Sequence, residues 1–227
     1  MQQTLAKITI NNAEDKKTYL CKIRVLDEHW KNALIILQNK VMASMVNQSL
    51  YIPLTEDEID EVLSGKGVFI GAVVEDKLVG FFMASFHDQE TIELGKASGI
   101  PEEELDQLVY IESSVVLPMV RGNGLLKKMI HECLVVLEKM NQFQHLIATV
   151  SPENIPSLKT TMDLGFKITH LSDIHGHYKR YVLYKNIPLK KPETKTWDGS
   201  LFEIWMKKPK ENYIRVGRKQ STEHISL

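Results

Sequence analysis

The sequence contains few cysteines and no long apolar segment. Only two of its 227 residues are cysteine, too few for the disulfide framework of a small secreted domain. Cys21 and Cys133 both lie in apolar stretches, which predicts buried, reduced thiols rather than a disulfide or a metal site. No apolar run approaches the roughly 18 residues that a membrane-spanning helix needs, and the first residues lack the layout of a signal peptide. We therefore expect a cytoplasmic protein with no membrane partner.

The chain also lacks a strong net charge. Its formal net charge is −1 at pH 7 and its pI is about 6.7, so no overall attraction to nucleic acid is expected. A content of 43% hydrophobic and 25% charged residues is ordinary for a globular protein. We expect one main domain over residues 19–189, with an N-terminal extension over residues 1–18 and a C-terminal extension over residues 190–227.

The C-terminal extension differs in composition from the rest of the chain. It holds nine Lys or Arg and five Asp or Glu, a net charge of +4. Basic residues interleaved with aromatic ones can bind nucleic acid. We favour the alternative that a pair of strands around residues 201–206 packs its aromatic side chains on the domain, with a frayed tail from Arg218. The aromatic residues concerned are Trp197, Phe202, Trp205 and Tyr213. No nucleic-acid partner is therefore predicted.

Runs of β-branched and aromatic residues predict the strands. Two such runs, residues 68–74 and 78–86, are separated by the short polar turn 75–77, which indicates a hairpin. The other predicted strands cover residues 5–10, 19–26, 108–116, 145–150 and 181–185. The first of these is an added strand within the N-terminal extension.

Capping signals and apolar periodicity predict the helices. Asp27 is placed to cap a helix over residues 28–46. Thr55 and Glu58 have the spacing of a capping box, and the helix that they begin should end near Gly65. The remaining helices are predicted directly after Pro101, within an insertion of residues 87–108, then over residues 126–140, and after Asn154.

A turn that contains two glycines joins the strand at residues 108–116 to the helix at residues 126–140. Gly122 and Gly124 let the backbone approach a ligand closely, and the first turn of the helix presents N–H groups without partners inside the helix. These donors and the positive end of the helix dipole form a site for phosphate. A plain connection between the two elements is the alternative. The spacings of the P-loop and of the dinucleotide-binding fingerprint are both absent.

The run Val-x-Pro-x-x-Arg-Gly-x-Gly-Leu around this turn resembles the acyl-CoA pyrophosphate loop of the GNAT superfamily of N-acyltransferases. The family pattern Arg/Gln-x-x-Gly-x-Gly/Ala falls on Arg121, Gly124 and Leu126. It departs from the pattern at Leu126, where the family has a small residue.

A second motif of the same family follows at the expected distance. The family places Asn-x-x-Ser/Ala after its fifth strand and then Gly-Phe, and this chain has Asn154, Ser157, Gly165 and Phe166 in that order. The two motifs together indicate a GNAT-like protein, which looks like a member of a bacterial, uncharacterised subgroup.

The resemblance runs from residue 19 to residue 187 and implies an α/β fold. Its mixed, mostly antiparallel sheet is splayed at the family's fourth and fifth strands, here residues 108–116 and 145–150, with helices on both faces. It implies acyl transfer from acetyl-CoA to a primary amine of a small molecule or peptide, by direct attack in a ternary complex and without a metal. The residues expected to bind acetyl-CoA are Val115, Val116, Arg121, Gly122, Asn123, Gly124, Leu125, Leu126 and Asn154.

Acyl transfer to an amine needs a base that removes a proton from the amine. Glu112 is the candidate, because side-chain alternation along a strand places it on the same face as Ser114 and Val116. Val116 is where the family directs a backbone N–H at the thioester oxygen. A carboxylate in an apolar strand needs a partner or has a raised pKa, and a raised pKa suits a base acting through water. The alternative is that Glu112 pairs with a lysine or a backbone donor.

The departing thiolate needs a proton, and the sequence leaves more than one source for it. Many family members use a tyrosine on the helix after Asn154, and the resemblance puts Thr161 at that position. A threonine hydroxyl can donate a hydrogen bond to sulfur but is much less acidic than a phenol. Three alternatives follow: the thiolate leaves unassisted, Tyr178 or another residue supplies the proton, or the protein is a weak catalyst.

Two further sets of polar residues have plainer interpretations. The acidic residues 56–61 and 102–106 would attract a cationic acceptor, but they are typical of solvated helix N-termini. His170, His175 and His177 have no carboxylate or cysteine at ligand spacing. We therefore predict no metal site.

Two functions stay open beside an acyl-CoA-dependent N-acyltransferase that acts as a monomer or homodimer. The first is a catalytically weak or regulatory module that binds acyl-CoA, which is suggested by Thr161. The second is a nucleic-acid-associated protein that acts through residues 190–227. The sequence favours the enzyme.

Overall fold

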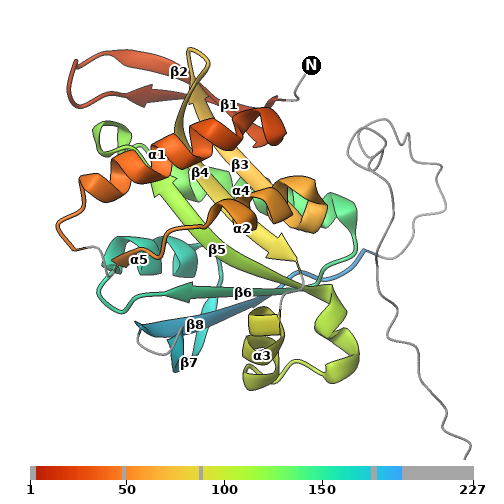
Figure 1. Ribbon diagram of the computed structural model, residues 1–227. Coiled ribbons are helices and arrows are strands. Elements are labelled where there is room, and N and C mark those ends of the chain that lie inside the picture. Colours follow the sequence, from red (N-terminus) through yellow and green to blue (C-terminus); the bar gives the residue numbers. More distant parts are fainter. Residues whose placement is uncertain (1–3, 48–49, 87–88, 175–177, 191–227) are drawn as a thin grey trace, which may run out of the picture. The chain divides into compact units, whose positions relative to one another are not determined.

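The computed structural model describes residues 4–47, 50–86, 89–174 and 178–190 (Figure 1). The strands of this part form one sheet in the order β1-β2-β3-β4-β5-β6-β8-β7. They are β1 (Thr4–Asn11), β2 (Thr18–Leu26), β3 (Gly67–Val74), β4 (Lys77–Phe86), β5 (Leu108–Val116), β6 (His145–Val150), β7 (Lys167–Ile174) and β8 (Tyr178–Asn186). The helical segments are the α-helices α1 (Lys31–Ala43), α2 (Glu56–Glu61), α3 (Gln89–Ala97), α4 (Leu125–Met140) and α5 (Ile155–Asp163), the 3-10 segments η1 (Glu28–Trp30), η4 (Glu102–Gln107) and η5 (Pro118–Val120), and the π segment η3 (Val62–Lys66).

The sheet opens between its two parallel strands. Strands β5 and β6 pair in parallel over residues 108–111 and 145–148, and the other neighbouring strands are antiparallel. The parallel pairing then stops, although β5 continues to Val116 and β6 to Val150. The predicted α/β fold, a mostly antiparallel sheet with a splay between these two strands, is confirmed.

Helices cover both faces of the sheet, with α1 and α2 in front and α4 behind in the view of Figure 1. Helix α1 packs on β4 and β5, and α4 packs on β3 and β4. The predicted apolar stripe of α4 is confirmed, and its buried residues include Leu125, Met129, Ile130, Cys133 and Leu137. Burying such a stripe against a sheet is the main source of a surface helix's stability.

Local sequence signals determine several element boundaries. The capping box is present: Glu58 N–H donates to Thr55 Oγ1 at 3.2 Å, and Thr55 N–H donates to Glu58 Oε2 at 2.6 Å. The π segment η3 after α2 contains Gly65 at a φ of 114°, a conformation that glycine tolerates best. The predicted hairpin of β3 and β4 is confirmed. Its turn places Glu75 and Asp76 at positive φ, as a two-residue turn between twisted strands requires.

The helix predicted over residues 28–46 is shorter in the structure. Asp27 caps it as expected, because its Oδ1 accepts a hydrogen bond from His29 N–H at 3.2 Å, but the first turn is the 3-10 segment η1. Helix α1 ends at Ala43, and Ser44 Oγ donates to the carbonyl oxygen of Val41 at 2.7 Å. This side-chain bond satisfies a terminal carbonyl and competes with continuation of the helix.

The insertion between β4 and β5 contains a helix, α3, that the sequence did not indicate. A Cβ at Gly95 would lie 2.8 Å from Leu108 Cδ2 and 2.9 Å from Leu105 Cδ2, so α3 packs closely on the chain that follows. The expected short helix after Pro101 is the 3-10 segment η4, with Pro101 at its N-cap. Leu94, Ile100, Leu105, Leu108, Tyr110, Ile147, Ile174 and Val182 form a second apolar cluster here.

The two extensions differ in what the structure describes. The added N-terminal strand is present as β1, antiparallel to β2. The strand pair expected around residues 201–206, the tail from Arg218 and the aromatic residues between them lie outside the described residues. The described helices include none that is long and apolar enough to cross a membrane.

Candidate functional site

The glycine turn lies at the start of α4, as the sequence predicts. Gly122 has a φ of 81° and Gly124 a φ of 70°, and a Cβ at either position would meet no atom within 4 Å. Gly124 is the N-cap of α4, and its carbonyl oxygen accepts from Lys128 N–H at 3.0 Å. Helix geometry leaves the preceding N–H groups of the first turn without intrahelical acceptors. The turn therefore presents backbone donors to open space.

A groove with a volume of about 800 Å³ runs along this turn. It lies between the end of α1, the C-terminal part of β5, the start of α4 and the start of α5. All of the residues expected to bind acetyl-CoA line it except Asn123, namely Val115, Val116, Arg121, Gly122, Gly124, Leu125, Leu126 and Asn154. The size of the groove fits acetyl-CoA as a ligand, and the backbone N–H groups of the turn are donors that can bind its phosphates.

Arg121 and Asn154 each have a structural role beside their place in the groove. Arg121 Nε donates to the carbonyl oxygen of Val116 at 3.1 Å, which ties the turn to the end of β5. Asn154 is the N-cap of α5, and its Oδ1 accepts from Ser157 N–H at 3.2 Å. Asn154 therefore caps α5 and also lines the groove.

The side chain of Asn123 makes contacts away from the groove. Its Oδ1 accepts a hydrogen bond from Asn11 N–H at 2.9 Å, and its Nδ2 donates to the carbonyl oxygens of Asn11 and Val120 at 2.8 and 3.0 Å. This side chain joins the turn to strand β1.

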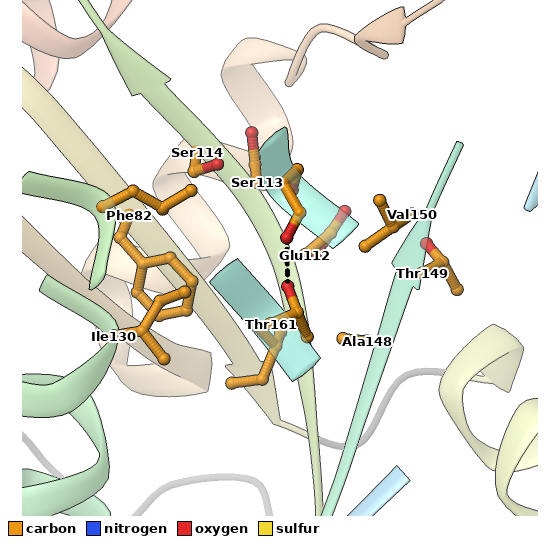
Figure 2. Close-up of a pocket in the computed structure, with 12 residues that line it drawn as sticks. Phe82, Glu112, Ser113, Ser114, Ile130, Ala148, Thr149, Val150 and Thr161 are labelled. Atoms are coloured by element: carbon orange, nitrogen blue, oxygen red, sulfur yellow. Dashed lines mark hydrogen bonds between the residues drawn. The ribbon is translucent and has the colours of Figure 1, made fainter. Parts of the chain in front are cut away.

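A second, small cavity of about 30 Å³ lies where β5 and β6 separate. Figure 2 shows Phe82 and Ile130 on one side of it and Ala148, Thr149 and Val150 on the other. It shares Ser114, Leu126 and Ser157 with the groove wall, so the two spaces adjoin. Glu112 and Thr161 both line it, and the structure thus brings together the two predicted catalytic residues, which are far apart in sequence.

Glu112 forms a β-bulge. Met83 of β4 pairs with Ser113 and Ala84 pairs with Ile111, so the strand register skips Glu112. Glu112 accepts a hydrogen bond from Ser85 Oγ at 3.1 Å. A bulge adds one residue to the strand and shifts the alternation of side chains that follows.

The expectation that Glu112 shares a face of β5 with Ser114 and Val116 is therefore wrong. Ser114 pairs with Phe82 and Val116 with Gly80, and a Cβ at Gly80 would lie 3.5 Å from Met129 of α4. These residues belong to the face covered by α4. Glu112 reaches the cavity from the other face because the strands have separated at this point.

Thr161 is buried on α5 and its hydroxyl is already bonded. Its Oγ1 donates to the carbonyl oxygen of Ser157, one turn earlier, at 3.0 Å. The dashed line in Figure 2 marks this bond. Tyr178, the alternative acid, lies at the start of β8 with the guanidinium of Arg180 5.2 Å from its ring centre, and it is not among the residues that line either cavity.

Tyr51 is a groove residue that the sequence did not indicate. Its hydroxyl donates to Gln38 Oε1 at 2.7 Å and lies 2.8 Å from Ser113 Oγ. The Gln38 amide also bonds both the N–H and the carbonyl oxygen of Leu54, at 2.8 and 2.9 Å. Burial raises the pKa of Tyr51, and the nearby Glu112 carboxylate raises it further. The phenol therefore keeps its proton and acts as a hydrogen-bond donor.

Several of the acidic residues in the stretches 56–61 and 102–106 have structural partners. Lys31 Nζ lies 2.7 Å from Asp60 Oδ2, and Glu58 forms the capping box. Glu104 Oε2 lies 2.9 Å from Nε2 of the buried His145, whose Nδ1 is 2.9 Å from Tyr184 Oη. The part of the chain that the structure describes brings together no group of three or more His, Cys, Asp or Glu that would hold a metal ion. Of the three histidines considered in the sequence, His175 and His177 lie outside the described residues.

Comparisons with known proteins agree with this geometry. A family model described as the acetyltransferase (GNAT) family matches residues 40–166. A GNAT-family acetyltransferase from Streptococcus pneumoniae is 18% identical, with 74% of this chain and 99% of that chain covered and a TM-score of 0.58. NAA60 from Arabidopsis thaliana, solved with a bisubstrate analogue, is 18% identical, with 75% and 99% covered and a TM-score of 0.58. A phosphinothricin acetyltransferase from Sinorhizobium meliloti, solved with acetyl-CoA, is 18% identical, with 79% and 97% covered and a TM-score of 0.54. No curated protein matches the sequence.

Proposed function

This chain belongs to the acetyltransferase (GNAT) family, and on that premise we propose that it transfers an acetyl group from acetyl-CoA to the primary amine of an acceptor. Transfer occurs by direct attack of the amine in a ternary complex. The observation that carries the proposal is the groove of about 800 Å³ that runs past the open glycine turn and adjoins the cavity lined by Glu112.

The turn at residues 121–126 holds the pyrophosphate of acetyl-CoA. Its backbone N–H groups and the positive end of α4 favour the negative charge, and Arg121 and Lys127 add two cationic side chains to the same wall. Val115 and Val116 lie farther along the groove, where the pantetheine arm runs toward the space between β5 and β6.

Glu112 is the base. The amine nitrogen forms a bond to the thioester carbonyl carbon while Glu112 takes one amine proton through a water molecule. The carbon–sulfur bond then breaks, its electron pair leaves on sulfur, and the thiolate takes up a proton. The products are the N-acetylated acceptor and free CoA.

The cavity between β5 and β6 limits the acyl group to acetyl. A cavity needs about 10–15 Å³ to hold one water molecule, so about 30 Å³ has room for a group of one or two heavy atoms. Phe82, Ile130 and Val150 provide apolar walls for a methyl group, and the remaining wall includes polar side chains. A methyl group fits it in size, and a longer acyl chain does not.

Two residues are positioned to support the departing sulfur. Thr161 donates to its own helix, so its hydroxyl must rotate before it can donate to the thiolate. Tyr51 lines the groove and keeps its proton, which makes it a second candidate for a hydrogen bond to the thiolate. If neither hydroxyl donates a hydrogen bond to the sulfur, the thiolate leaves unassisted and takes its proton from water.

A catalytically weak acyl-CoA-binding or regulatory module is the second candidate function. The engaged hydroxyl of Thr161 favours it, because no phenol occupies that position on α5. This candidate binds CoA tightly and releases no thiol when amines are added.

The acceptor is a small-molecule or peptide amine, which the protein acetylates in the cytoplasm as a monomer or homodimer. No nucleic acid, membrane or metal takes part. The catalytic unit spans residues 19–189, between the extensions 1–18 and 190–227.

A thiol-release assay with acetyl-CoA and a broad panel of amines tests the proposal. We expect amine-dependent release of CoA by the wild type, and a loss of about 10²-fold or more in kcat for Glu112→Gln. The matched control is Glu104→Gln, because Glu104 pairs with His145 and is not among the residues that line either cavity. CoA binding without thiol release for any amine would instead support the regulatory module.

A further inference from the structure

The N-terminal strand β1 is bonded directly to the glycine turn. The family model begins at residue 40, so β1 precedes the matched region by about 30 residues of chain. Even so, Asn11 and Asn123 exchange two hydrogen bonds: Asn11 N–H donates to Asn123 Oδ1 at 2.9 Å, and Asn123 Nδ2 donates to the carbonyl oxygen of Asn11 at 2.8 Å. The Asn123 side chain thus makes the two hydrogen bonds to the backbone of Asn11 that a neighbouring strand would make with β1.

A second contact joins the same two segments. The N–H of Ala13 donates to the carbonyl oxygen of Met119 at 2.7 Å, and Met119 lies in η5, just before the turn. Asn11 is itself fixed, because it pairs with Thr18 of β2 and its Oδ1 accepts from Thr18 Oγ1 at 2.8 Å. The turn is therefore attached to the edge of the sheet at two points.

The position of Asn123 makes this attachment important for the shape of the turn. It lies between Gly122 and Gly124, which both have positive φ. Glycines leave a backbone free to adopt many conformations, so a turn with two of them orders only when other contacts hold it. Asn123 Nδ2 also donates to the carbonyl oxygen of Val120 at 3.0 Å, which closes the turn on itself.

We propose that Asn123 is a positioning residue and that strand β1 acts through it to hold the turn ready for the pyrophosphate of acyl-CoA. On this proposal the side chain of Asn123 holds the turn instead of contacting the ligand, while its backbone N–H stays among the donors of the turn. Without the attachment, binding must also order the turn, and the affinity falls by that cost. This inference rests on the proposed function, because it requires that the groove binds CoA.

Calorimetric titration of the full chain with CoA tests the inference and needs no acceptor. For Asn123→Ala we expect a dissociation constant about 10-fold larger than that of the wild type, and in the assay a raised KM for acetyl-CoA with kcat nearly unchanged. The matched control is Asn12→Ala. Asn12 is next to Asn11, but its Oδ1 accepts from Glu14 N–H at 2.8 Å within the β1–β2 turn. The CoA affinity of Asn12→Ala should therefore stay within about twofold of that of the wild type.

Hydrogen exchange of the wild type gives a second measurement that does not depend on a variant folding. If the turn and β1 are coupled, ligand binding at one must stabilise the other, because coupling free energies are reciprocal. We expect CoA to slow exchange at the turn and also at the amides of Asn11, which donates to Asn123, and Ala13, which donates to Met119 just before the turn.

The possible failures are distinguishable. A wild type that does not bind CoA contradicts the proposed function, and this inference with it. A wild type that binds CoA while folded Asn123→Ala binds equally well contradicts this inference alone, as does protection that stops at the turn and does not reach Asn11 and Ala13. A purely structural anchor would lower the melting temperature of Asn123→Ala and leave its CoA affinity unchanged.

Discussion

Thr161 Oγ1 donates a 3.0 Å hydrogen bond to the carbonyl oxygen of Ser157 one turn earlier in α5. The proton that would assist a departing thiolate is therefore held by the helix backbone. A Val side chain has nearly the same shape and lacks only this hydroxyl. We expect Thr161→Val to keep kcat within about threefold of the wild type, since general acid catalysis by a positioned group contributes at least about 10²-fold. A loss of 10²-fold in thiol release, with CoA affinity intact, would assign the acid role to Thr161.

Tyr51 is expected to matter more than Thr161 for the reaction. Tyr51→Phe removes the donor to Gln38 and the partner of Ser113. Stability should fall by about 1–2 kcal/mol, because buried groups lose a hydrogen bond, and kcat should fall by about 10-fold with KM for acetyl-CoA unchanged. Tyr178→Phe is the matched control, since Tyr178 is 38% exposed and lines neither cavity. A Tyr51→Phe variant with wild-type kcat would remove Tyr51 from the chemistry.

The pH dependence of stability offers a separate test of the Tyr51 environment. Burial raises the pKa of Tyr51 above that of an unfolded chain, where a phenol titrates near pH 10. The stability gained by keeping the proton is thus fully present below pH 10 and is lost as the pH rises further. The buried Cys21, whose pKa is raised to about 11, adds to this loss. In urea unfolding, the free energy of unfolding of Tyr51→Phe should fall less steeply above pH 10 than that of the wild type. An equally steep fall for both proteins would contradict the burial of the Tyr51 phenol.

Acyl-chain selection is predicted to depend on Phe82. Phe82→Leu enlarges the cavity at the splay, so the ratio of activity with butanoyl-CoA to activity with acetyl-CoA should rise about 10-fold. Phe81→Leu is the matched control, because Phe81 is equally buried but packs edge-on against Phe69 and is not among the residues that line the cavity. Both variants should lose about 1–3 kcal/mol of stability, because each removes buried atoms and leaves space behind. An unchanged ratio for Phe82→Leu, or an equal rise in both variants, would show that this cavity does not hold the acyl group.

Much of the fold was predictable because its signals are local. The capping box of Thr55 and Glu58, the hairpin turn at residues 75–77 and the apolar stripe of α4 each depend on residues within a few positions of one another. Local preferences and global packing agree at these places. The glycine turn and its position before α4 were predictable for the same reason.

The features that could not be predicted from the sequence are those that join distant segments of the chain. The bulge at Glu112 depends on the register between β4 and β5, so counting along β5 alone assigned Glu112 to the wrong face. Tyr51 meets Ser113 across 62 positions, and Asn123 meets Asn11 across 112. Helix α3 was missed because its sequence is polar and contains Gly95, whose small size matters only through its packing against Leu105 and Leu108.

Calorimetric titration of the wild-type chain with acetyl-CoA tests the central claim most directly. The account predicts saturable binding of one acetyl-CoA per chain, weakened by about 10-fold in Arg121→Ala because a cation beside the pyrophosphate is lost. It also predicts that higher salt weakens wild-type binding more than it weakens binding by Arg121→Ala. No binding at millimolar acetyl-CoA, or equal binding by the two proteins, would contradict the assignment of the groove and its glycine turn to acetyl-CoA.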